Sequence, residues 1–451
     1  MTQQATDRLP FLLLAALLLV AFLFGGGGIG AALANLAVQL TALAVLAMRR
    51  EAFAAFWRES PLALRALVVL SIALPLAQII PLPEALWQSL PGRAPVTASL
   101  ALTGAGNSAQ WMPFSFDPRR TLLAATALVT PLAVLCAGWT LPRERLIDLG
   151  WGVVALGLVT VLIGAAQLAG GSDAATLYGS RQPGQILLGT FANRNSTGLF
   201  LTFALGLAAL LPARRPHPVV MPARLATCAL LLLAVVLTQS RTALVLAAIP
   251  VLLGVLRALT QRMPGGSAPR TAMIGLGALA LVAMGAGALV VAAPGRIAAT
   301  LERFEAKDDP RRFIWDDAVY TAGRHWPVGA GIGTFDELYQ IDESLENLTL
   351  RRAGRAHNDY IEITIEAGAL GLALVAAWLV LLAWLSWRAR GSRAHWAAWA
   401  GSAFLLAIAL QSVTDYPLRN QTILALAGFA LLLLTRIAAG EPGRERARRD
   451  A

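Results

Sequence analysis

The sequence predicts an all-α integral membrane protein that crosses the bilayer many times. Hydrophobic residues make up 57% of the 451 residues and charged residues only 14%, a composition too apolar for a water-soluble globular protein. Apolar runs recur along nearly the whole chain, and each is close to the roughly 20 residues that a helix needs to cross the hydrocarbon core. No separate water-soluble domain is evident between these runs.

The apolar runs predict about twelve transmembrane helices. The expected spans cover residues 10–26, 29–48, 62–82, 121–140, 149–170, 196–212, 225–239, 242–259, 271–293, 361–386, 394–413 and 420–437. The first span follows a single basic residue, Arg8, and the "GGGG" run after it leads straight into more apolar sequence instead of a cleavage site. We therefore expect a retained helix and not a signal peptide.

Arginine-rich loops alternate with arginine-poor loops and predict the orientation. The loops "RREAFAAFWRES", "LPRERLID", "PARRPHPVVMPAR", "RALTQRMPGGSAPR" and "WRARGSR" all fall on one side of the expected spans. By the positive-inside rule this side is cytoplasmic, together with both termini. The net charge of +11 comes largely from such loops and does not indicate nucleic-acid binding.

The opposite side receives one long segment, residues 294–360. It contains charges of both signs, but long translocated segments are largely exempt from the charge rule. The mixture of apolar and charged residues in "DDPRRFIWDDAVYTAG" predicts helices that form a partly amphipathic lid on the membrane surface. The glycine run "GAGIGTF" in this segment follows no strand, so we do not interpret it as a nucleotide-binding loop.

His357 is the first candidate for chemistry. It lies in "GRAHNDYIEITIEAGALG", directly before an expected span. The unperturbed histidine pKa near 6.5 suits a general base that accepts a proton from a hydroxyl group. An interfacial histidine without a role is the alternative. Asn358, Asp359 and Glu362 are suited to capping the helix that follows, with Glu362 placed as the carboxylate of a capping box.

Arg241 is the second candidate, because "LTQSRTALVLAAIPVLLG" interrupts apolar sequence with one arginine and no acidic neighbour. An ionisable residue at such a depth usually faces a water-filled cavity or a bound anion. The alternative is that its side chain snorkels to the interface beside Gln239 and Ser240. Both interpretations stay open on the sequence alone.

Arg311 and Arg312 in "DDPRRFIWDDAV" are the third candidates, because guanidinium groups bind phosphate oxygens through paired hydrogen bonds. The alternative is a solvated surface pair with the two preceding aspartates. In "GTFANRNSTG", Asn193 and Arg194 form a polar entry to a helix, for which capping is the default interpretation. Cys136 and Cys228 lie in apolar runs, where small buried side chains are expected and neither a disulfide nor a metal site is.

Four segments together form a recognisable pattern. In "HNDYIEITIEAGALG" the matching positions are His357, Asn358, Tyr360, Glu366, Gly368 and Gly371. The segments "TQSR", "RRFIWDDAVYTAGRHWPVGAGIGTF" and "GTFANRN" provide the others. The chain thereby resembles the O-antigen ligase superfamily of bacterial membrane glycosyltransferases, which includes O-antigen ligases and the related polysaccharide polymerases. The resemblance covers roughly residues 189–451.

The resemblance implies an all-helical, GT-C-like membrane fold with a cavity under a periplasmic loop. Residues 1–188 are then an N-terminal transmembrane bundle, and residues 189–451 form the O-antigen ligase-like domain with its periplasmic loop at 294–360. The expected location is the bacterial inner membrane, with several spans and an active site facing the periplasm.

The resemblance also implies a reaction in lipopolysaccharide or polysaccharide biosynthesis. The donor is a glycan on undecaprenyl diphosphate. The acceptor hydroxyl belongs to lipid A-core in a ligase, or to a second lipid-linked glycan in a polymerase. We expect inversion at the sugar carbon and neither a metal nor another cofactor. The residues expected at the site are His357 as the base, Arg241, Arg311 and Arg312 at the diphosphate, with spacing favouring Arg311, and Asn358, Tyr360, Glu366, Asn193 and Arg194 in support.

A polytopic transporter or flippase is the main alternative from another class. Transporters usually contain internal repeats and polar breaks near the membrane midplane. The sequence contains no evident repeat, and its polar clusters fall at one face of the expected spans, so an enzyme is favoured. A structural membrane scaffold is a third hypothesis, which predicts that substitutions of His357 and Arg241 are tolerated.

Overall fold

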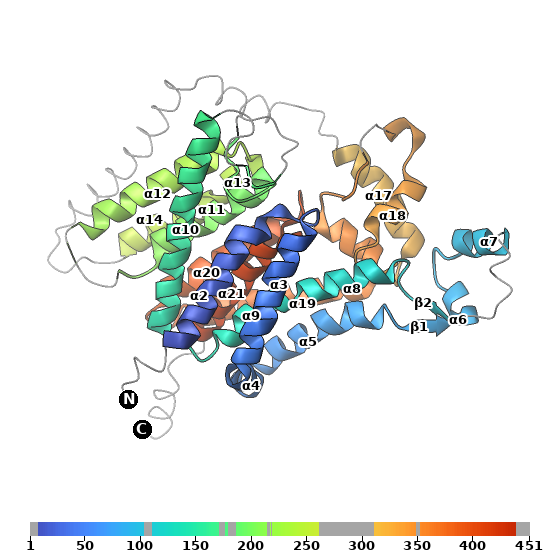
Figure 1. The fold of residues 1–451 in the computed structure, drawn as a ribbon, viewed down its shortest axis with the longest axis horizontal. Coiled ribbons are helices and arrows are strands. Elements are labelled where there is room, and N and C mark those ends of the chain that lie inside the picture. The colour runs from blue at the N-terminus through green and yellow to red at the C-terminus, as the bar shows by residue number, and fades with distance from the viewer. Residues whose placement is uncertain are drawn as a thin grey trace.

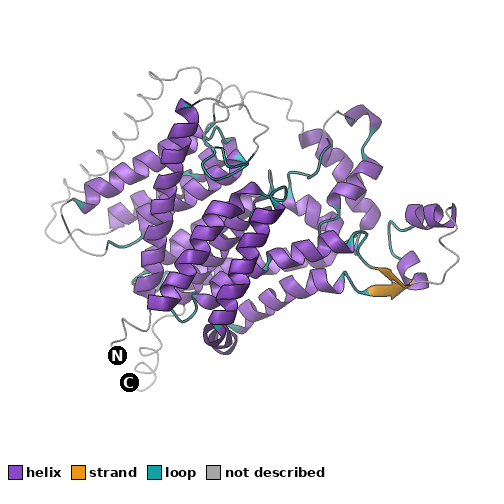
Figure 2. Ribbon diagram, in the orientation of Figure 1, coloured by secondary structure: helices purple, strands orange, loops and turns teal. Residues whose placement is uncertain are grey.

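The structure is a computed structural model that describes residues 8–102, 111–170, 176–178, 186–213, 217, 219–260, 311–348 and 352–438. Helices make up nearly all of the described structure, as Figure 2 shows, which confirms the predicted all-α class. The exception is a short antiparallel pair of strands, β1 (Pro81–Pro83) and β2 (Trp111–Pro113).

The helices fall into a central bundle and two flanking groups (Figure 1). They are α2 (Arg8–Phe24), α3 (Ala32–Met48), α4 (Arg50–Glu59), α5 (Leu62–Ala77), α6 (Glu84–Gln88), α7 (Ala94–Leu102), α8 (Pro118–Ala127), α9 (Val129–Ala137), α10 (Arg143–Ala169), α11 (Arg194–Leu210), α12 (Val220–Leu237), α13 (Arg241–Leu246), α14 (Ala248–Thr260), α17 (Arg311–His325), α18 (Phe335–Asp342), α19 (Asp359–Ala389), α20 (His395–Gln411) and α21 (Gln421–Ala438), with short 3-10 turns η1 (Gly25–Gly27), η3 (Leu345–Asn347) and η4 (Pro417–Arg419). Helices α10 to α14 flank the bundle on one side, and α17, α18 and the strand pair project from the other.

Six described helices or helix pairs are long and apolar enough to cross a membrane. They are Arg8–Gly27, Pro118–Ala137, Arg143–Ala169, Val220–Leu237, Arg241–Thr260 and Asp359–Ala389, and α3 with α4 makes a seventh if this pair, bent by 79°, is counted as one span. The expected number of twelve was higher because it counted apolar runs, and some of these runs form helices of only 16 or 17 residues, such as α5, α11 and α20. Seventeen residues reach about 25 Å, less than the roughly 30 Å of a hydrocarbon core. The expected span at 271–293 lies outside the described residues.

Helix α11 lies between α20 of the central bundle and the flanking helices α12 and α14, and it is buried along nearly its whole length. Its Phe203 ring stacks on Phe404 of α20 with 4.1 Å between the ring centroids. A helix that is apolar on all sides is expected at the centre of a large bundle. This packing fixes the start of α11, and therefore Arg194, at one end of the molecule.

The first and last described helices run antiparallel. Asn420, at the start of α21, donates from Nδ2 to the Gly26 carbonyl at 3.1 Å, and the Thr422 hydroxyl donates to the Ala21 carbonyl at 2.6 Å. Hence the start of α2 and the end of α21 lie together at the other end of the bundle. We call the end at which α19 begins the His357 end, and the other the opposite end.

Helix α19 is interrupted where the sequence predicted an unbroken span. Gly368 has φ +57° and ψ −142° inside the helix. At the break, backbone groups of α19 bond to a glycine-rich turn. The Gly331 amide donates to the Glu366 carbonyl at 2.8 Å, and the Ala369 amide donates to the Pro327 carbonyl at 2.8 Å. A Cβ atom on Gly368 would lie 2.0 Å from the Pro327 oxygen, so only glycine fits. The glycine run is therefore a structural turn in the described structure.

Gln78, directly after α5, fastens this turn to the bundle. The residue is 5% exposed, donates from Nε2 to the Glu366 carbonyl at 3.0 Å and accepts from the Ile332 backbone amide at 2.9 Å. Ser115, which follows the strand pair, donates its backbone amide to the Gln78 carbonyl at 2.7 Å. One residue, through its side chain and its backbone carbonyl, thus holds three segments in register.

Replacing Gln78 by alanine is expected to destabilise the protein by roughly 1–3 kcal/mol, because the Ile332 amide loses its acceptor and the Glu366 carbonyl loses one of its two donors. The measurement is thermal unfolding in detergent. Gln88→Ala is the control, since Gln88 is exposed and bonds only to Glu84 within its own helix. Equal melting temperatures for the two variants would show that Gln78 does not fasten the turn.

Candidate active site

His357 lies directly before α19, and one edge of its imidazole ring is covered by neighbouring side chains. Its Nδ1 is 3.4 Å from Oδ1 of Asp415, and the Tyr416 ring lies 5.0 Å from its own ring. The His357 side chain is 31% exposed, whereas that of Asp415 is 3% exposed. Its backbone has φ +51°, an uncommon conformation for a residue other than glycine, which the surrounding structure must hold in place. The imidazole is anchored on one side and accessible on the other.

The start of α19 fixes the position of His357. Asn358 caps the helix, because its side-chain oxygen accepts from the Tyr360 and Ile361 amides at 3.0 and 3.2 Å. This confirms the predicted capping role of Asn358. Asp359 donates its backbone amide to the Ser412 carbonyl at 2.8 Å, which ties the start of α19 to the end of α20.

Glu362 does not form the predicted capping box, and that prediction was wrong. The cap is Asn358, so Glu362 lies one position beyond the one that a capping-box carboxylate occupies. Its fully buried carboxylate instead accepts from Arg355 Nη1 at 3.0 Å, from the Ala356 backbone amide at 3.0 Å and from Arg419 Nη2 at 3.3 Å. The carboxylate therefore holds the segment that leads into His357.

Glu366 is the second buried carboxylate of this cluster. It accepts from Arg419 Nη2 at 3.0 Å and does not contact His357. Burial lowers the pKa of Arg419, but the carboxylates of Glu366 and Glu362 outweigh burial and raise it above its ordinary value, so the guanidinium stays charged. Glu366 thus anchors, through Arg419, the loop that also carries Asp415.

Asp415 is the important residue that the sequence did not single out. Its Oδ2 accepts from Asn195 Nδ2 at 2.7 Å, and Asn195 Oδ1 accepts from the Ser240 hydroxyl at 2.8 Å. All three residues are buried, and they link His357 to the starts of α11 and α13. The available signal was an acidic residue in "TDYPLRN", at the end of an expected span. Its partner is 58 residues away in the chain, which local patterns do not reveal.

Arg241 is the first residue of α13 and directly follows Ser240, whose hydroxyl accepts from the Ala243 amide at 3.3 Å and so caps this helix. The Thr242 and Thr414 hydroxyls are 3.2 Å apart, which ties α13 to the residue before Asp415. The structure therefore brings Arg241 to the His357 end of the bundle, and its side chain is half-buried there.

Asn193 and Arg194 begin α11 at the same end. Asn193 caps the helix by accepting from the Asn195 amide at 2.8 Å, as predicted. Arg194 Nη1 is buried and has no hydrogen-bond partner among the residues that the structure describes. A guanidinium with an available donor at a helix N-terminus is suited to an anion, because the helix dipole favours negative charge there.

Arg311 and Arg312 begin α17 and differ in their surroundings. Arg312 is exposed and Arg311 is half-buried. Trp315, one turn further along α17, donates from Nε1 to the carbonyl of Ala356 at 2.8 Å, next to His357. The two aspartates that precede Arg311 lie outside the described residues.

The pKa of Tyr416 depends on the charged groups around it. Burial and the Asp415 carboxylate raise the pKa of Tyr416 to about 12, while Arg355 and Arg311 act in the opposite direction. Arg311 is therefore close enough to Tyr416 to lower the pKa of that side chain, and the Tyr416 ring lies beside the His357 ring. This favours Arg311 over Arg312 as a residue of the site.

Tyr360 has a structural contact. Its hydroxyl donates to the Ala409 carbonyl at 2.8 Å and so joins α19 to α20. In this arrangement it positions the start of α19 and does not face the imidazole edge. Among the described residues no group of three or more His, Cys, Asp or Glu side chains is placed to hold a metal ion.

A second polar cluster, in the projecting group, is closed to substrate. His325, at the end of α17, is 1% exposed, and burial and the neighbouring Arg93 lower its pKa to about 4. Arg93 is fully buried, with its guanidinium carbon 3.9 Å from the centre of the Phe116 ring. This cation–π contact joins the segment after α6 to the segment after β2, and the Phe116 ring in turn lies 5.5 Å from the His325 ring of α17.

Comparison with known proteins identifies a family domain in part of this chain. Residues 226–376 match the model of the O-antigen ligase family. The chain carries an O-antigen ligase domain. The matched region begins in α12 and ends in α19, so it contains Arg241, Arg311 and His357, whereas Asp415 and the start of α11 lie outside it. No curated protein matches the chain.

The chain is thus a membrane enzyme whose residues 226–376 form an O-antigen ligase domain, the domain of a family that acts in lipopolysaccharide and polysaccharide biosynthesis. The matched region is shorter than the predicted domain at residues 189–451, whose boundaries stay a prediction. The substrates of this family are lipid-linked glycans.

Proposed function

We propose that this protein is an O-antigen ligase that transfers a glycan from undecaprenyl diphosphate to a hydroxyl group of lipid A-core. The observation that carries the proposal is the pairing of His357 with buried Asp415, at the end of the bundle where Arg194, Arg241 and Arg311 also lie. This arrangement combines a proton acceptor with cations suited to a diphosphate, inside an O-antigen ligase domain.

His357 is the general base. A neutral imidazole that donates its Nδ1 hydrogen to Asp415 keeps the Nε2 lone pair for the acceptor hydroxyl, and the carboxylate stabilises the imidazolium that forms. The oxygen of that hydroxyl attacks the anomeric carbon of the donor sugar while its proton passes to Nε2. General base catalysis of this kind commonly contributes about 10²–10⁴-fold to a rate.

The arginines stabilise the leaving group. The bond between the anomeric carbon and the diphosphate oxygen breaks, and its electron pair stays on that oxygen. Preorganised cations stabilise this growing charge more than they stabilise the ground state. Arg241 and Arg311 take this role, and Arg194 supports them with its available donor. Attack opposite the leaving group inverts the configuration of the sugar carbon. Because guanidinium groups neutralise the diphosphate, we propose that no metal is required.

The proposed orientation places the His357 end in the periplasm. The arginine-containing loops around Arg49 and Arg143 lie at the opposite end, where Arg49 donates to the Thr140 hydroxyl at 2.8 Å and Arg436 lies over the Trp139 ring. By the positive-inside rule that end faces the cytoplasm. A base at the edge of the bilayer then meets a donor whose lipid lies in the membrane and whose glycan lies outside it.

Arg311→Gln is expected to lower the transfer rate by about 10²-fold, the typical effect of losing one group that stabilises a developing charge. Arg312→Gln provides the matched control, since Arg312 is the adjacent residue but is exposed, and a change of less than about threefold is expected. Initial rates with lipid-linked glycan measure both. Equal losses in the two variants would contradict the assignment of Arg311.

Reconstitution of the wild-type protein tests the proposed acceptor. The purified protein in lipid receives undecaprenyl diphosphate-linked glycan and lipid A-core, with a chelator present, and the products are resolved by gel electrophoresis and mass spectrometry. Glycan-bearing lipid A-core is the expected product. A glycan that lengthens only on its own carrier identifies a polymerase instead, and absence of any transfer with authentic substrates would favour a transporter. Activity that returns only with added divalent metal overturns the metal-free mechanism.

A further inference from the structure

A second set of unpartnered donors lies at the corner between α4 and α5, at the opposite end of the bundle. Helix α4 turns 79° from α3 and therefore runs across the end of the bundle. It buries Ala55 and Phe56 against the bundle and leaves Arg50 and Arg58 exposed. This is the pattern of an amphipathic helix that lies in the interface between the membrane and water.

The corner is distant from the candidate active site. Helix α5 ends next to Gln78, whose side chain bonds to Glu366 near that site. Arg65 precedes Gln78 by 13 residues, which corresponds to about 20 Å along a helix. A ligand at Arg65 therefore does not share the glycan-transfer site, and the inference does not depend on the proposed reaction.

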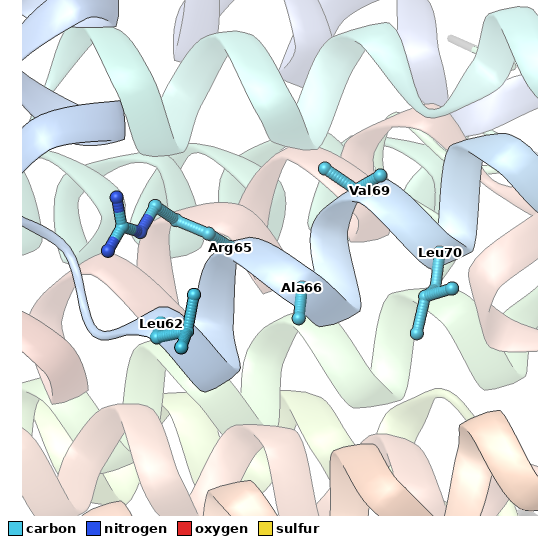
Figure 3. Close-up of a pocket in the computed structure, with 5 residues that line it drawn as sticks. All are labelled: Leu62, Arg65, Ala66, Val69 and Leu70. Atoms are coloured by element: carbon cyan, nitrogen blue, oxygen red, sulfur yellow. The ribbon is translucent and has the colours of Figure 1, made fainter.

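A shallow groove runs along α5 from this corner. Its volume is about 440 Å³, and its lining is Leu62, Arg65, Ala66, Val69 and Leu70. In Figure 3 the Arg65 guanidinium extends from the first turn of α5, while the apolar side chains follow one another along the helix. The groove is thus apolar along its length and cationic at one end.

Three donors at the cationic end lack acceptors. Arg65 donates from Nη1 to the Trp57 carbonyl, but Arg65 Nε, the Trp57 indole nitrogen and the Ser60 hydroxyl are buried without a hydrogen-bond partner in the described part of the chain. Ser60 is 3% exposed. Buried donors without acceptors are rare in folded proteins and indicate a missing partner.

The charge around the corner favours an anion. Residues 49–65 contain four arginines and two glutamates, and the exposed charges next to Ser60 are Arg58 and Glu59. Clusters of arginine at a membrane surface attract anionic lipids, and tryptophan is enriched at that depth. A free phosphate would meet the donors, but it would leave Leu62, Val69 and Leu70 uncovered. A phosphate joined to an acyl chain satisfies both parts.

We propose that this corner binds one anionic phospholipid. Its phosphate oxygens accept hydrogen bonds from Arg65, Trp57 and Ser60, and one acyl chain lies in the groove along Ala66, Val69 and Leu70. A net negative headgroup is preferred over a zwitterionic one because of the arginine excess.

Native mass spectrometry of the full chain in detergent tests the proposal, with equal amounts of phosphatidylglycerol and phosphatidylcholine of the same acyl composition. Wild type is expected to retain phosphatidylglycerol preferentially. Arg65→Gln is expected to weaken this retention about tenfold, the effect of losing one charge-assisted hydrogen bond. Arg390→Gln is the matched control, because Arg390 lies over the Trp387 ring just after the end of α19 and is not among the residues that line this groove. Its retention should equal that of wild type.

A second variant tests the groove without changing charge. Ala66→Phe fills the groove from an exposed position, so it is expected to reduce phosphatidylglycerol retention while the melting temperature stays that of wild type. Inorganic phosphate is the other probe, and it should not compete. Equal retention of the two lipids by wild type, unchanged retention in Arg65→Gln or Ala66→Phe, or competition by inorganic phosphate would each overturn the proposal.

Discussion

His357→Ala is expected to lower the rate of glycan transfer by about 10²–10⁴-fold, the usual contribution of a general base. The imidazole is the proton acceptor of the proposed site, and Ala leaves no group beside Asp415 to take the proton of the acceptor hydroxyl. Donor affinity should change little, because the arginines remain. Single-turnover transfer in lipid vesicles measures the rate separately from donor binding.

His217→Ala is the control for this prediction, since His217 is an exposed histidine remote from the site in the described structure. It should transfer glycan at the wild-type rate. If His357→Ala retained more than about a tenth of the wild-type rate, the assignment of His357 as the base would be wrong.

Asp415→Asn is expected to lower kcat by on the order of 10²-fold or more, although the side chain keeps its size. Asn195 donates to one oxygen of Asp415, and Ser240 holds Asn195 in that orientation. The oxygen of the introduced amide therefore pairs with Asn195, and its NH₂ group faces His357. A donor in this position favours the wrong imidazole tautomer and does not stabilise the imidazolium.

The readout for Asp415→Asn is the split between kcat and KM. Because Asp415 is buried behind the imidazole, KM for the lipid-linked donor should stay near its wild-type value. Asp148→Asn, a carboxylate near the start of α10 that pairs with Arg145, is the control and should change neither constant. A rise in KM with an unchanged kcat would mean that Asp415 binds donor and does not act through His357.

The sequence predicted features that depend on neighbouring residues. Apolar runs locate the helices because burial in lipid or in the bundle requires them, and Asn358 and Asn193 were predicted as caps because the groups they satisfy lie within three residues. The family resemblance placed His357, Arg241 and Arg311 in one site, and the structure brings the segments that carry them to one end of the bundle.

Features that depend on distant residues were not predictable in this way. Asp415 lies 58 residues from His357, and Arg419 lies 57 residues from Glu362. Only the fold brings such pairs together, so Glu362 was mistaken for a local cap. The break at Gly368 was not predictable either. Glycine is needed there because of the nearby Pro327 carbonyl, which only the fold brings close.

The number of membrane spans could not be predicted from hydropathy alone. Hydropathy measures how apolar a segment is, but a helix at the centre of a bundle is equally apolar whether or not it reaches both membrane surfaces. Helix α11 is buried almost throughout and has 17 residues. Its length, and not its composition, separates it from the six longer spans.

A double-mutant cycle between His357 and Asp415 in the reconstituted transfer reaction decides whether Asp415 acts through His357. If Asp415 acts through His357, then adding Asp415→Asn to the His357→Ala variant costs almost nothing further, and the combined loss is close to that of His357→Ala alone. If the two losses instead multiply, the residues act independently, and the account of His357 as a base held by Asp415 is contradicted.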